Sequence, residues 1–322
     1  MSNQYFHRRD ILKTVLSAPA LILTTSVSRA SSAPTKRDPL PVFSRQIHSG
    51  HSLTDAAIWM GEGWPDKHYA KLLKTLGRGK PNIARSTVPG STMLYRQENE
   101  PEGGWNDIAD YEAIIITERN DTYPFSVYED KYKWINEIRA ERRQTMTDWF
   151  KRSQKIGNNG QGSEFFYYTP WPGHSNYTRP DEKHVYIPKN WRDRLLHDEV
   201  EHLDVASAAE RNVGSDGKIW IVPGNAMMMR IYDDAEAGKV PGIADGEAFL
   251  TSPDWWGDDV HPTGFGSLAL AYLHMYVVHH VDPRGKVYAR IDLDPAPNSE
   301  QATYIQEMIY DLIQNYPRAG VV

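Results

Sequence analysis

From Val42 onward the chain alternates short apolar runs with longer stretches of helical periodicity, and this alternation limits the possible folds more than any other feature. Short apolar runs that end at turn residues are typical of buried strands, and helices between them connect strands that run in the same direction. The candidate strands are residues 43–48, 82–87, 113–117, 164–169 and 218–222. The third contains Ile114-Ile115-Ile116, a β-branched run typical of a central strand. We therefore predict an α/β domain around a mostly parallel five-stranded sheet.

The stretches between and after these runs predict helices, the clearest being 134–156, 191–211, 265–280 and one that begins at Asn298. In the second helix one stripe of apolar residues is expected to be buried, and it consists of Leu196, Val200, Leu203 and Ala206. The last helix has Gln301 three residues after Asn298, the spacing of a capping box, and Pro317 would stop it.

The first thirty residues have the pattern of a targeting segment. Arg8-Arg9 precedes a weakly apolar stretch, residues 14–27, and Ser28-Arg29-Ala30 offers the small residues of a cleavage site. A short membrane anchor is the alternative, but an apolar stretch of about 14 residues is too short for a ~30 Å hydrocarbon core. We predict a twin-arginine signal peptide at 1–30 and hence a periplasmic or secreted protein, with no stable membrane insertion after cleavage.

The predicted domain organisation follows from that boundary. Residues 31–41 are rich in Ser, Pro and charge and are expected to be a linker. A single catalytic domain is predicted at 42–283, and 284–322 would be a C-terminal extension whose helix packs on the same domain.

Charge and cysteine content exclude several classes of function. The predicted signal peptide carries four basic residues and one acidic residue, so without it the formal net charge falls from −6 to −9. An acidic chain without a basic run is a poor partner for nucleic acid. The chain contains no cysteine, so it has neither disulfides nor a thiolate metal site.

Ser52 directly follows the first predicted strand, in the segment Gly50-His51-Ser52-Leu53-Thr54. A serine where a strand turns into a helix has its hydroxyl exposed at the carboxyl edge of the sheet. The ordinary alternative is that this serine only caps the helix. Ser52 alone leaves both interpretations open.

The segment Asp258-Asp259-Val260-His261-Pro262 favours the first interpretation. An aspartate three residues before a histidine can place its carboxylate beside Nδ1, which leaves Nε2 free to take a proton from a serine. A single Asp-x-x-His is a weak signal. Its position near the end of a chain whose first strand leads to a serine makes a hydrolase the better prediction.

These segments resemble the SGNH hydrolases, also called GDSL esterases and lipases, over roughly residues 42–281. The first block of that family is similar to the Ser52 segment, and Asp-x-x-His-Pro is similar to its last block, with Gly266 also in place. Two further blocks resemble Gly90, within Ser86 to Thr92, and Glu118-Arg119-Asn120-Asp121. The resemblance implies a three-layer α/β/α sandwich of the flavodoxin-like kind.

The resemblance also implies site residues. The catalytic set would be Ser52, His261 and Asp258, and the oxyanion hole would take the N–H groups of Ser52 and Gly90 and the side-chain amide of Asn120. The chain departs from the family pattern at two positions: His51 stands in place of Asp and Glu118 in place of Gly. Glu118 is expected to put a carboxylate near the oxyanion hole.

Tryptophans flank the predicted catalytic segments and indicate the substrate. They are Trp59, Trp64, Trp171, Trp255 and Trp256. Each of them, taken singly, is most often a core residue. Together they favour stacking on flat sugar rings over an acyl-chain tunnel, and so they are predicted to bind substrate.

A helix-borne metal site is the other chemistry to weigh. His197 and His202 enclose acidic residues, but zinc proteases have their two histidines four residues apart, whereas these are five apart. We interpret the helix as a solvated acidic face and expect no metal and no cofactor.

The sequence therefore predicts a serine esterase that hydrolyses O-acyl esters, in the first place O-acetyl esters on a carbohydrate, through a Ser-His-Asp triad and an acyl-enzyme. A lipase, arylesterase or thioesterase on the same fold is the alternative enzyme. An inactive, exported carbohydrate-binding protein is the alternative outside catalysis.

Overall fold

The computed structural model describes residues 36–58, 68–76, 81–99, 104–119, 135–174, 190–214, 217–286 and 297–322. Within these ranges five strands form one sheet, in the order β2-β1-β3-β4-β5, and every neighbouring pair is parallel. The strands are β1 (Arg45–Gly50), β2 (Asn82–Thr87), β3 (Ala113–Ile116), β4 (Glu164–Tyr168) and β5 (Ile219–Val222). The predicted parallel five-stranded sheet is confirmed. Its first strand ends two residues later than expected, so only His51 separates it from Ser52.

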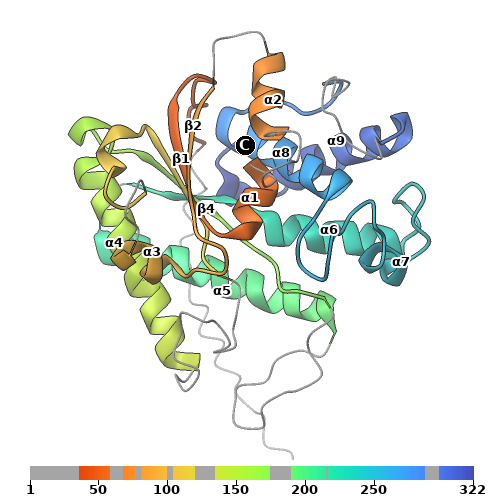
Figure 1. Cartoon of the computed structure of the whole chain (residues 1–322), viewed down its shortest axis with the longest axis horizontal. Helices are drawn as coiled ribbons and strands as arrows, with labels where there is room; N and C mark the ends of the chain where they lie inside the picture. The colour runs from red at the N-terminus through yellow and green to blue at the C-terminus, as the bar shows by residue number, and fades with distance from the viewer. Residues whose placement is uncertain are drawn as a thin grey trace, which may run out of the picture. The chain divides into compact units, whose positions relative to one another are not determined.

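Side chains of successive strand residues point to opposite faces of the sheet. Apolar side chains of the inner strands are buried on both faces, so both faces are covered. Ile115 and Phe166 belong to one buried apolar cluster, whereas Ile114, Ile116 and Phe165 belong to another. Inner strands that are apolar on both faces, such as β3 and β4, need a helical layer on each face to exclude water. The predicted three-layer α/β/α sandwich is therefore also confirmed (Figure 1).

The helices divide between the two faces. The first cluster is completed by α1 (Ser52–Ile58), α2 (His68–Thr75), α6 (Gly224–Glu236), α7 (Gly246–Leu250), α8 (Gly264–His279) and α9 (Ser299–Gln314). The second is completed by α3 (Met93–Asn99), α4 (Ile135–Gly160) and the C-terminal half of α5 (Trp191–Val213). Short 3-10 turns lie at Ile108–Asp110 and Pro317–Ala319.

Helix α8 is the central helix of its layer, and all of its residues are buried. α9 packs against it and contributes Ile305, Ile309 and Ile313 to the same cluster. The predicted capping box at the start of α9 is confirmed, since Asn298 accepts from the N–H of Gln301 while the Gln301 side chain accepts from the N–H of Asn298. Among the described residues no helix combines the length and the apolar character needed to cross a bilayer.

The prediction for the apolar stripe of α5 is wrong for Leu196 and Val200, whereas Ala206 is buried and Leu203 packs against the core as expected. Leu196 and Val200 are 50% and 61% exposed, whereas Asp198, Glu199 and His202 are buried. The polar face is buried because residues from other elements satisfy it. These contacts are Tyr167 Oη with His202 Nδ1 at 2.7 Å, Asn225 Nδ2 to Glu199 at 2.9 Å, and the Tyr316 hydroxyl to Glu199. The interpretation of this helix as a solvated acidic face is wrong for the same reason.

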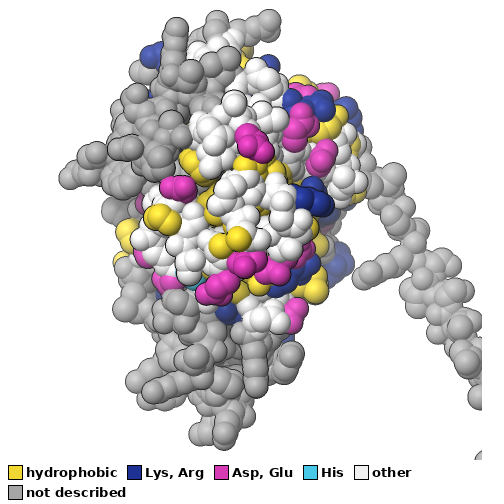
Figure 2. All heavy atoms as spheres, turned by 90° about the vertical axis from the view of Figure 1, so that its right-hand side faces the viewer, with side chains coloured by type: hydrophobic (Ala, Val, Ile, Leu, Met, Phe, Trp, Pro, Cys, Tyr) yellow, Lys and Arg dark blue, Asp and Glu magenta, His cyan; other side chains and the backbone are white. Residues whose placement is uncertain are grey.

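Figure 2 shows the face that lies on the right-hand side of Figure 1. Acidic side chains are interspersed there with basic ones, and hydrophobic side chains lie apart from one another. The described residues of this face form no continuous basic patch.

Candidate active site

The carboxyl ends of three strands meet at one edge of the sheet. In the parallel register Gly50 of β1 lies opposite Thr87 of β2, and Ser49 lies opposite Ile116 of β3. The loops that follow these strands therefore start side by side, the arrangement in which open α/β sheets bind ligands.

Ser52 is the first residue of α1 and is half-buried. The chain turns sharply to reach it. A Cβ atom on Gly50 would lie 1.9 Å from Thr54 Oγ1, so only glycine allows α1 to pack back against the end of its own strand. The close turn aims the serine side chain away from the core.

His261 lies on the loop before α8 and reaches Ser52 across 209 positions of sequence, with 2.7 Å between His261 Nε2 and Ser52 Oγ. On the other side of the ring, Nδ1 lies 2.7 Å from Asp258 Oδ2. Since a carboxylate oxygen only accepts, Nδ1 carries the proton, and the unprotonated Nε2 accepts from the serine hydroxyl. The structure thus brings the three predicted catalytic residues together in a Ser-His-Asp chain.

Asp258 is held by its own loop. Its Oδ1 accepts the N–H groups of Val260, at 2.9 Å, and of His261, at 2.7 Å. Partial burial raises the pKa of Asp258, but the hydrogen bonds from His261 and Val260 outweigh it and hold the pKa below its ordinary value. The carboxylate therefore stays ionised at neutral pH.

A second loop braces the segment that carries Asp258 and His261. It follows β4 and includes Trp171 and His174. The indole N–H of Trp171 donates to the carbonyl oxygen of Val260 at 2.9 Å, and the backbone N–H of His174 donates to that of Asp259 at 2.8 Å. His174 is not among the predicted site residues, although its position just after the fourth predicted strand, at the same edge as Ser52, indicates a place near the site.

The structure corrects the role predicted for the three described tryptophans. Trp171, Trp255 and Trp256 are only 1%, 3% and 6% exposed. They pack beneath the Asp258–His261 loop with Trp191 and Phe249, mostly edge to face. A ring buried on both faces cannot stack on a sugar, so these three form part of the core.

Gly90 lies in the turn after β2, close to the end of β1. The N–H of Val88 donates to the carbonyl oxygen of Gly50 at 3.0 Å, which fixes this turn beside Ser52. Gly90 has φ +69°, and a Cβ there would meet no atom within 4 Å. Glycine is thus favoured by the backbone conformation and not by lack of space.

His51, which stands where the family pattern has Asp, organises the start of α1. Its Nδ1 accepts the N–H of Leu53 at 3.3 Å, and its carbonyl oxygen accepts those of Thr54 and Asp55 at 2.8 and 3.2 Å. In the part of the chain that the structure describes, the N–H of Ser52 is left without such an acceptor.

The same histidine links β1 to the loop after β3. Burial and the positive charge of Arg96 lower the pKa of His51 to about 3, so the ring is neutral at pH 7. Because Nδ1 accepts, Nε2 carries the proton and donates to the carbonyl oxygen of Glu118 at 3.3 Å.

Glu118 is buried, with 2% of its surface exposed. It accepts the N–H of Met93, at the start of α3, at 3.1 Å and the N–H of Arg119 at 2.6 Å. Burial raises the pKa of Glu118, against the opposing effect of Arg142 and Arg96. This acidic replacement therefore ties the loop after β3 to α3.

Three predicted site residues, Asn120, Trp59 and Trp64, lie outside the described residues, as does the predicted signal peptide. Within the described ranges, no three His, Asp or Glu side chains converge so that they could hold a metal ion.

No family model and no curated protein matches the chain. Among solved structures it is similar to a DUF4886 family protein from Bacteroides uniformis, with a TM-score of 0.51, 13% identity, and coverage of 85% of this chain and 95% of that one. At this identity the similarity shows a shared fold and nothing more.

Two further similar structures have lower scores. One is described as a GDSL-like lipase from Parabacteroides merdae, with a TM-score of 0.46, 13% identity, and coverage of 76% of this chain and 99% of that one. The other is a catalytic mutant of an acetylxylan esterase from Geobacillus stearothermophilus, with a TM-score of 0.45, 14% identity, and coverage of 78% and 98%.

Proposed function

We propose that the protein is a serine hydrolase that cleaves carboxylic esters through an acyl-enzyme, with Ser52 as nucleophile, His261 as general base and Asp258 as the group that orients it. One observation carries the proposal: two hydrogen bonds of 2.7 Å link Ser52, His261 and Asp258 in a continuous chain. A serine that only capped α1 would not need a histidine from a distant loop.

In the first half-reaction Ser52 Oγ forms a bond to the ester carbonyl carbon while its proton passes to His261 Nε2. The carbonyl electron pair moves to oxygen, which gives a tetrahedral oxyanion. His261 then gives its proton to the alcohol oxygen, and the bond between that oxygen and the carbonyl carbon breaks. The alcohol departs, and Ser52 remains acylated.

The second half-reaction repeats these steps with water. His261 Nε2 takes a proton from the attacking water, and on collapse of the second oxyanion it returns that proton to Ser52 Oγ. Asp258 stays ionised throughout and stabilises the imidazolium. The free serine and a carboxylic acid are the products.

For the oxyanion hole we propose the N–H groups of Ser52 and Gly90 and the side-chain amide of Asn120. Support for the first comes from His51, which occupies the next three N–H groups of α1 but not that of Ser52. Support for the second comes from the turn that holds Gly90 beside the end of β1. Asn120 follows Arg119, whose guanidinium donates to the carbonyl oxygen of Gly90 at 3.3 Å.

For the substrate we propose a short O-acyl ester, acetyl first, on an exported or cell-surface carbohydrate. Because Trp171, Trp255 and Trp256 are buried, they do not support a carbohydrate substrate. The proposal rests on Trp59 and Trp64 and on the targeting pattern of residues 1–30. Initial rates on acetylated xylan, acetylated pectin and p-nitrophenyl esters of increasing chain length separate this substrate from that of a lipase, arylesterase or thioesterase. Highest kcat/KM on long acyl chains would replace the carbohydrate with a lipid substrate.

The test of the nucleophile is labelling with a fluorophosphonate probe, followed by peptide mapping. Wild type is expected to be labelled at Ser52, and Ser52→Ala to lose both labelling and ester hydrolysis with little change in melting temperature, because a helix-capping serine contributes only about 1 kcal/mol. Ser299→Ala, an exposed serine that also starts a helix, is the matched control and should keep full activity. Turnover by Ser52→Ala near the wild-type rate would overturn the assignment.

We also propose export by the twin-arginine route. Replacing Arg8 and Arg9 together by lysine is expected to leave the protein in the cytoplasm, active when purified, because the pair is read by the translocon. Continued export of the double variant would contradict this route.

A further inference from the structure

The proposed oxyanion donors come from the ends of three different strands, and their spacing has to be fixed to a fraction of an ångström for them to act on one oxygen atom. Among the described residues, the last backbone hydrogen bonds that join these segments run from the N–H of Val88 to the carbonyl oxygen of Gly50, at 3.0 Å, and from the N–H of Thr117 to that of Ser49, at 2.9 Å. Beyond Val88 and Thr117, side chains have to hold the loops together.

One side chain touches all three segments. Arg96, on α3, is fully buried. Its Nε donates to Ser49 Oγ on β1 at 3.0 Å, its Nη1 donates to the carbonyl and hydroxyl oxygens of Ser91 at 3.0 and 2.9 Å, and its Nη2 donates to the carbonyl oxygen of Thr117. These acceptors lie before Ser52, directly after Gly90 and shortly before Asn120.

The surroundings of Arg96 make this arrangement rigid. Ser49, Ser91 and Thr117 are each 0% exposed, so water does not compete for the guanidinium. Glu118 caps the start of the same helix and bonds to the N–H of Arg119. A buried guanidinium is costly unless all its N–H groups are satisfied, so a shift of any one loop would leave a buried N–H of this charged group without an acceptor.

Arginine is suited to this task because its guanidinium is planar and presents several donors in a fixed fork. An ammonium group has the same charge, but its three N–H groups start from one nitrogen and do not reproduce the spacing of donors on the three guanidinium nitrogens. The geometry of the charge therefore matters as well as its presence.

We propose that Arg96 is a positioning residue that holds the segments of Ser52 and Gly90 and the start of the loop after β3, at Thr117, in the relative placement that transition-state binding requires. This inference rests on the proposed function, since it assumes that those three segments bind the oxyanion. Arg96 itself does not touch the substrate. Its effect should appear in kcat and not in KM, because the displaced donors matter most when charge develops on the oxygen.

The test compares Arg96→Lys with wild type in three measurements: kcat and KM on p-nitrophenyl acetate, melting temperature, and affinity for an alkylboronic acid that forms a tetrahedral adduct with the serine. We expect a kcat lower by about 10²-fold, the cost of a small misplacement of catalytic groups, with KM nearly unchanged. The affinity for the boronic acid should fall in parallel with kcat/KM. Arg192→Lys is the matched control, because Arg192 is bonded to Asp233 on the surface, with Nε–Oδ1 at 2.6 Å.

Arg96→Lys could fail to fold, so two milder variants accompany it. Ser49→Ala and Ser91→Ala each remove one hydroxyl contact of the guanidinium while Arg96 stays in place. Both should lower kcat and boronic acid affinity together, by less than Arg96→Lys does.

The outcomes separate this inference from the proposed function. Absence of Ser52-dependent hydrolysis in wild type would refute the proposed function, and this inference with it. If wild type hydrolyses esters through Ser52 while the folded Arg96 and serine variants lose only melting temperature, the positioning role is refuted and the proposed function stands.

Discussion

The indole N–H of Trp171 donates a hydrogen bond of 2.9 Å to the carbonyl oxygen of Val260, the residue directly before His261. Trp171 follows β4 and Val260 lies between α7 and α8, so this bond joins the loop after β4 to the loop that carries His261. Trp171 was predicted from the sequence to stack on a sugar ring. In the structure it supports the loop that carries His261.

Trp171→Phe is expected to lower kcat on a small ester several-fold, because it removes a hydrogen bond worth about 1 kcal/mol from the loop of His261 while keeping an aromatic ring. KM on acetylated xylan should not change selectively. Trp256→Phe is the matched control, since the indole N–H of Trp256 has no hydrogen-bond partner among the described residues. A rise in KM for the polysaccharide alone would restore the substrate-binding role.

Gly90→Ala should lower kcat far more than it lowers stability. An alanine at φ +69° is strained by about 1 kcal/mol, and the loop relieves that strain by moving its N–H away from the oxyanion. Gly238→Ala is the control, because Gly238 has φ +65°, equally open space and no place in the site. We expect Gly90→Ala and Gly238→Ala to lower the melting temperature equally, and only Gly90→Ala to lower kcat. Unchanged kcat in both would remove Gly90 from the oxyanion hole.

Asn120→Ala is expected to lower kcat roughly 10²–10³-fold, about 2.7–4 kcal/mol, with KM nearly unchanged, as for other oxyanion donors. Asn120→Asp should be at least as damaging, because a carboxylate would face the developing negative charge. Steady-state kinetics with a melting curve tests this. An Asn120→Ala enzyme within about fivefold of wild-type kcat, well short of the loss of a typical oxyanion donor, would mean that this hole uses another donor.

The free energy of unfolding should fall as the pH is lowered from 6.5 to 4, partly because of His274. Burial lowers the pKa of His274 to about 4, whereas the unfolded chain has the ordinary value of 6.5. Between those values the unfolded state binds the proton and the folded state does not, so stability rises with pH by up to about 1.4 kcal/mol per unit for this group. The contribution is complete above pH 6.5 and is lost on acidification.

His274→Gln should reduce that slope, as measured by urea unfolding at pH 4.5, 5.5 and 6.5. His197→Gln is the comparison of opposite sign, because the hydrogen bond with Asp198 raises the pKa of His197 and its contribution is lost as the pH rises. An identical slope in wild type and His274→Gln would show that the histidine is not neutral in the folded protein.

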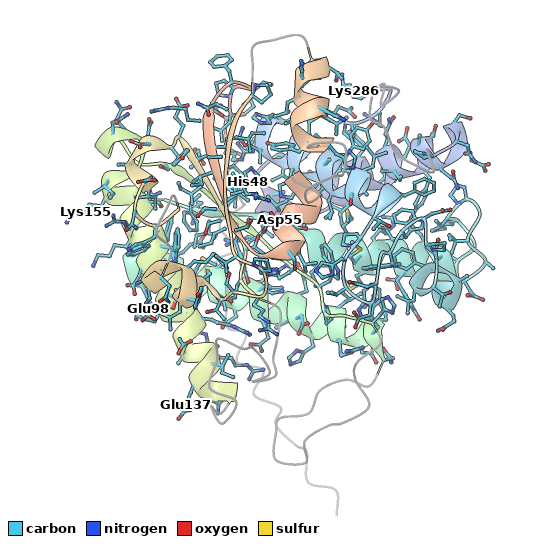
Figure 3. All side chains as sticks on the ribbon, viewed as in Figure 1. His48, Asp55, Glu98, Glu137, Lys155 and Lys286 are labelled. Carbon is cyan, nitrogen blue, oxygen red and sulfur yellow. The ribbon has the colours of Figure 1, made fainter. Side chains whose placement is uncertain are left out.

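Figure 3 labels His48, which lies on β1 with its ring centroid 5.7 Å from that of His274.

Much of the fold could be predicted from the sequence, because it depends on local patterns. A short β-branched run such as Ile114-Ile115-Ile116 is typical of a strand buried on both faces, and the Asn298–Gln301 capping box is complete within four residues. The Asp258–His261 unit is similarly local, since Asp258 bonds to N–H groups two and three positions ahead.

Only the tertiary structure decided which side chains are buried. The Leu196 and Val200 stripe of α5 is exposed, while Glu199 is buried because Asn225 and Tyr316 reach it from far along the chain. Apolar periodicity does not reveal a buried polar face, since its burial depends on partners that the helix does not contain. The same holds for Trp171, whose role follows from Val260, and for Ser52, which meets its histidine only after the chain has folded.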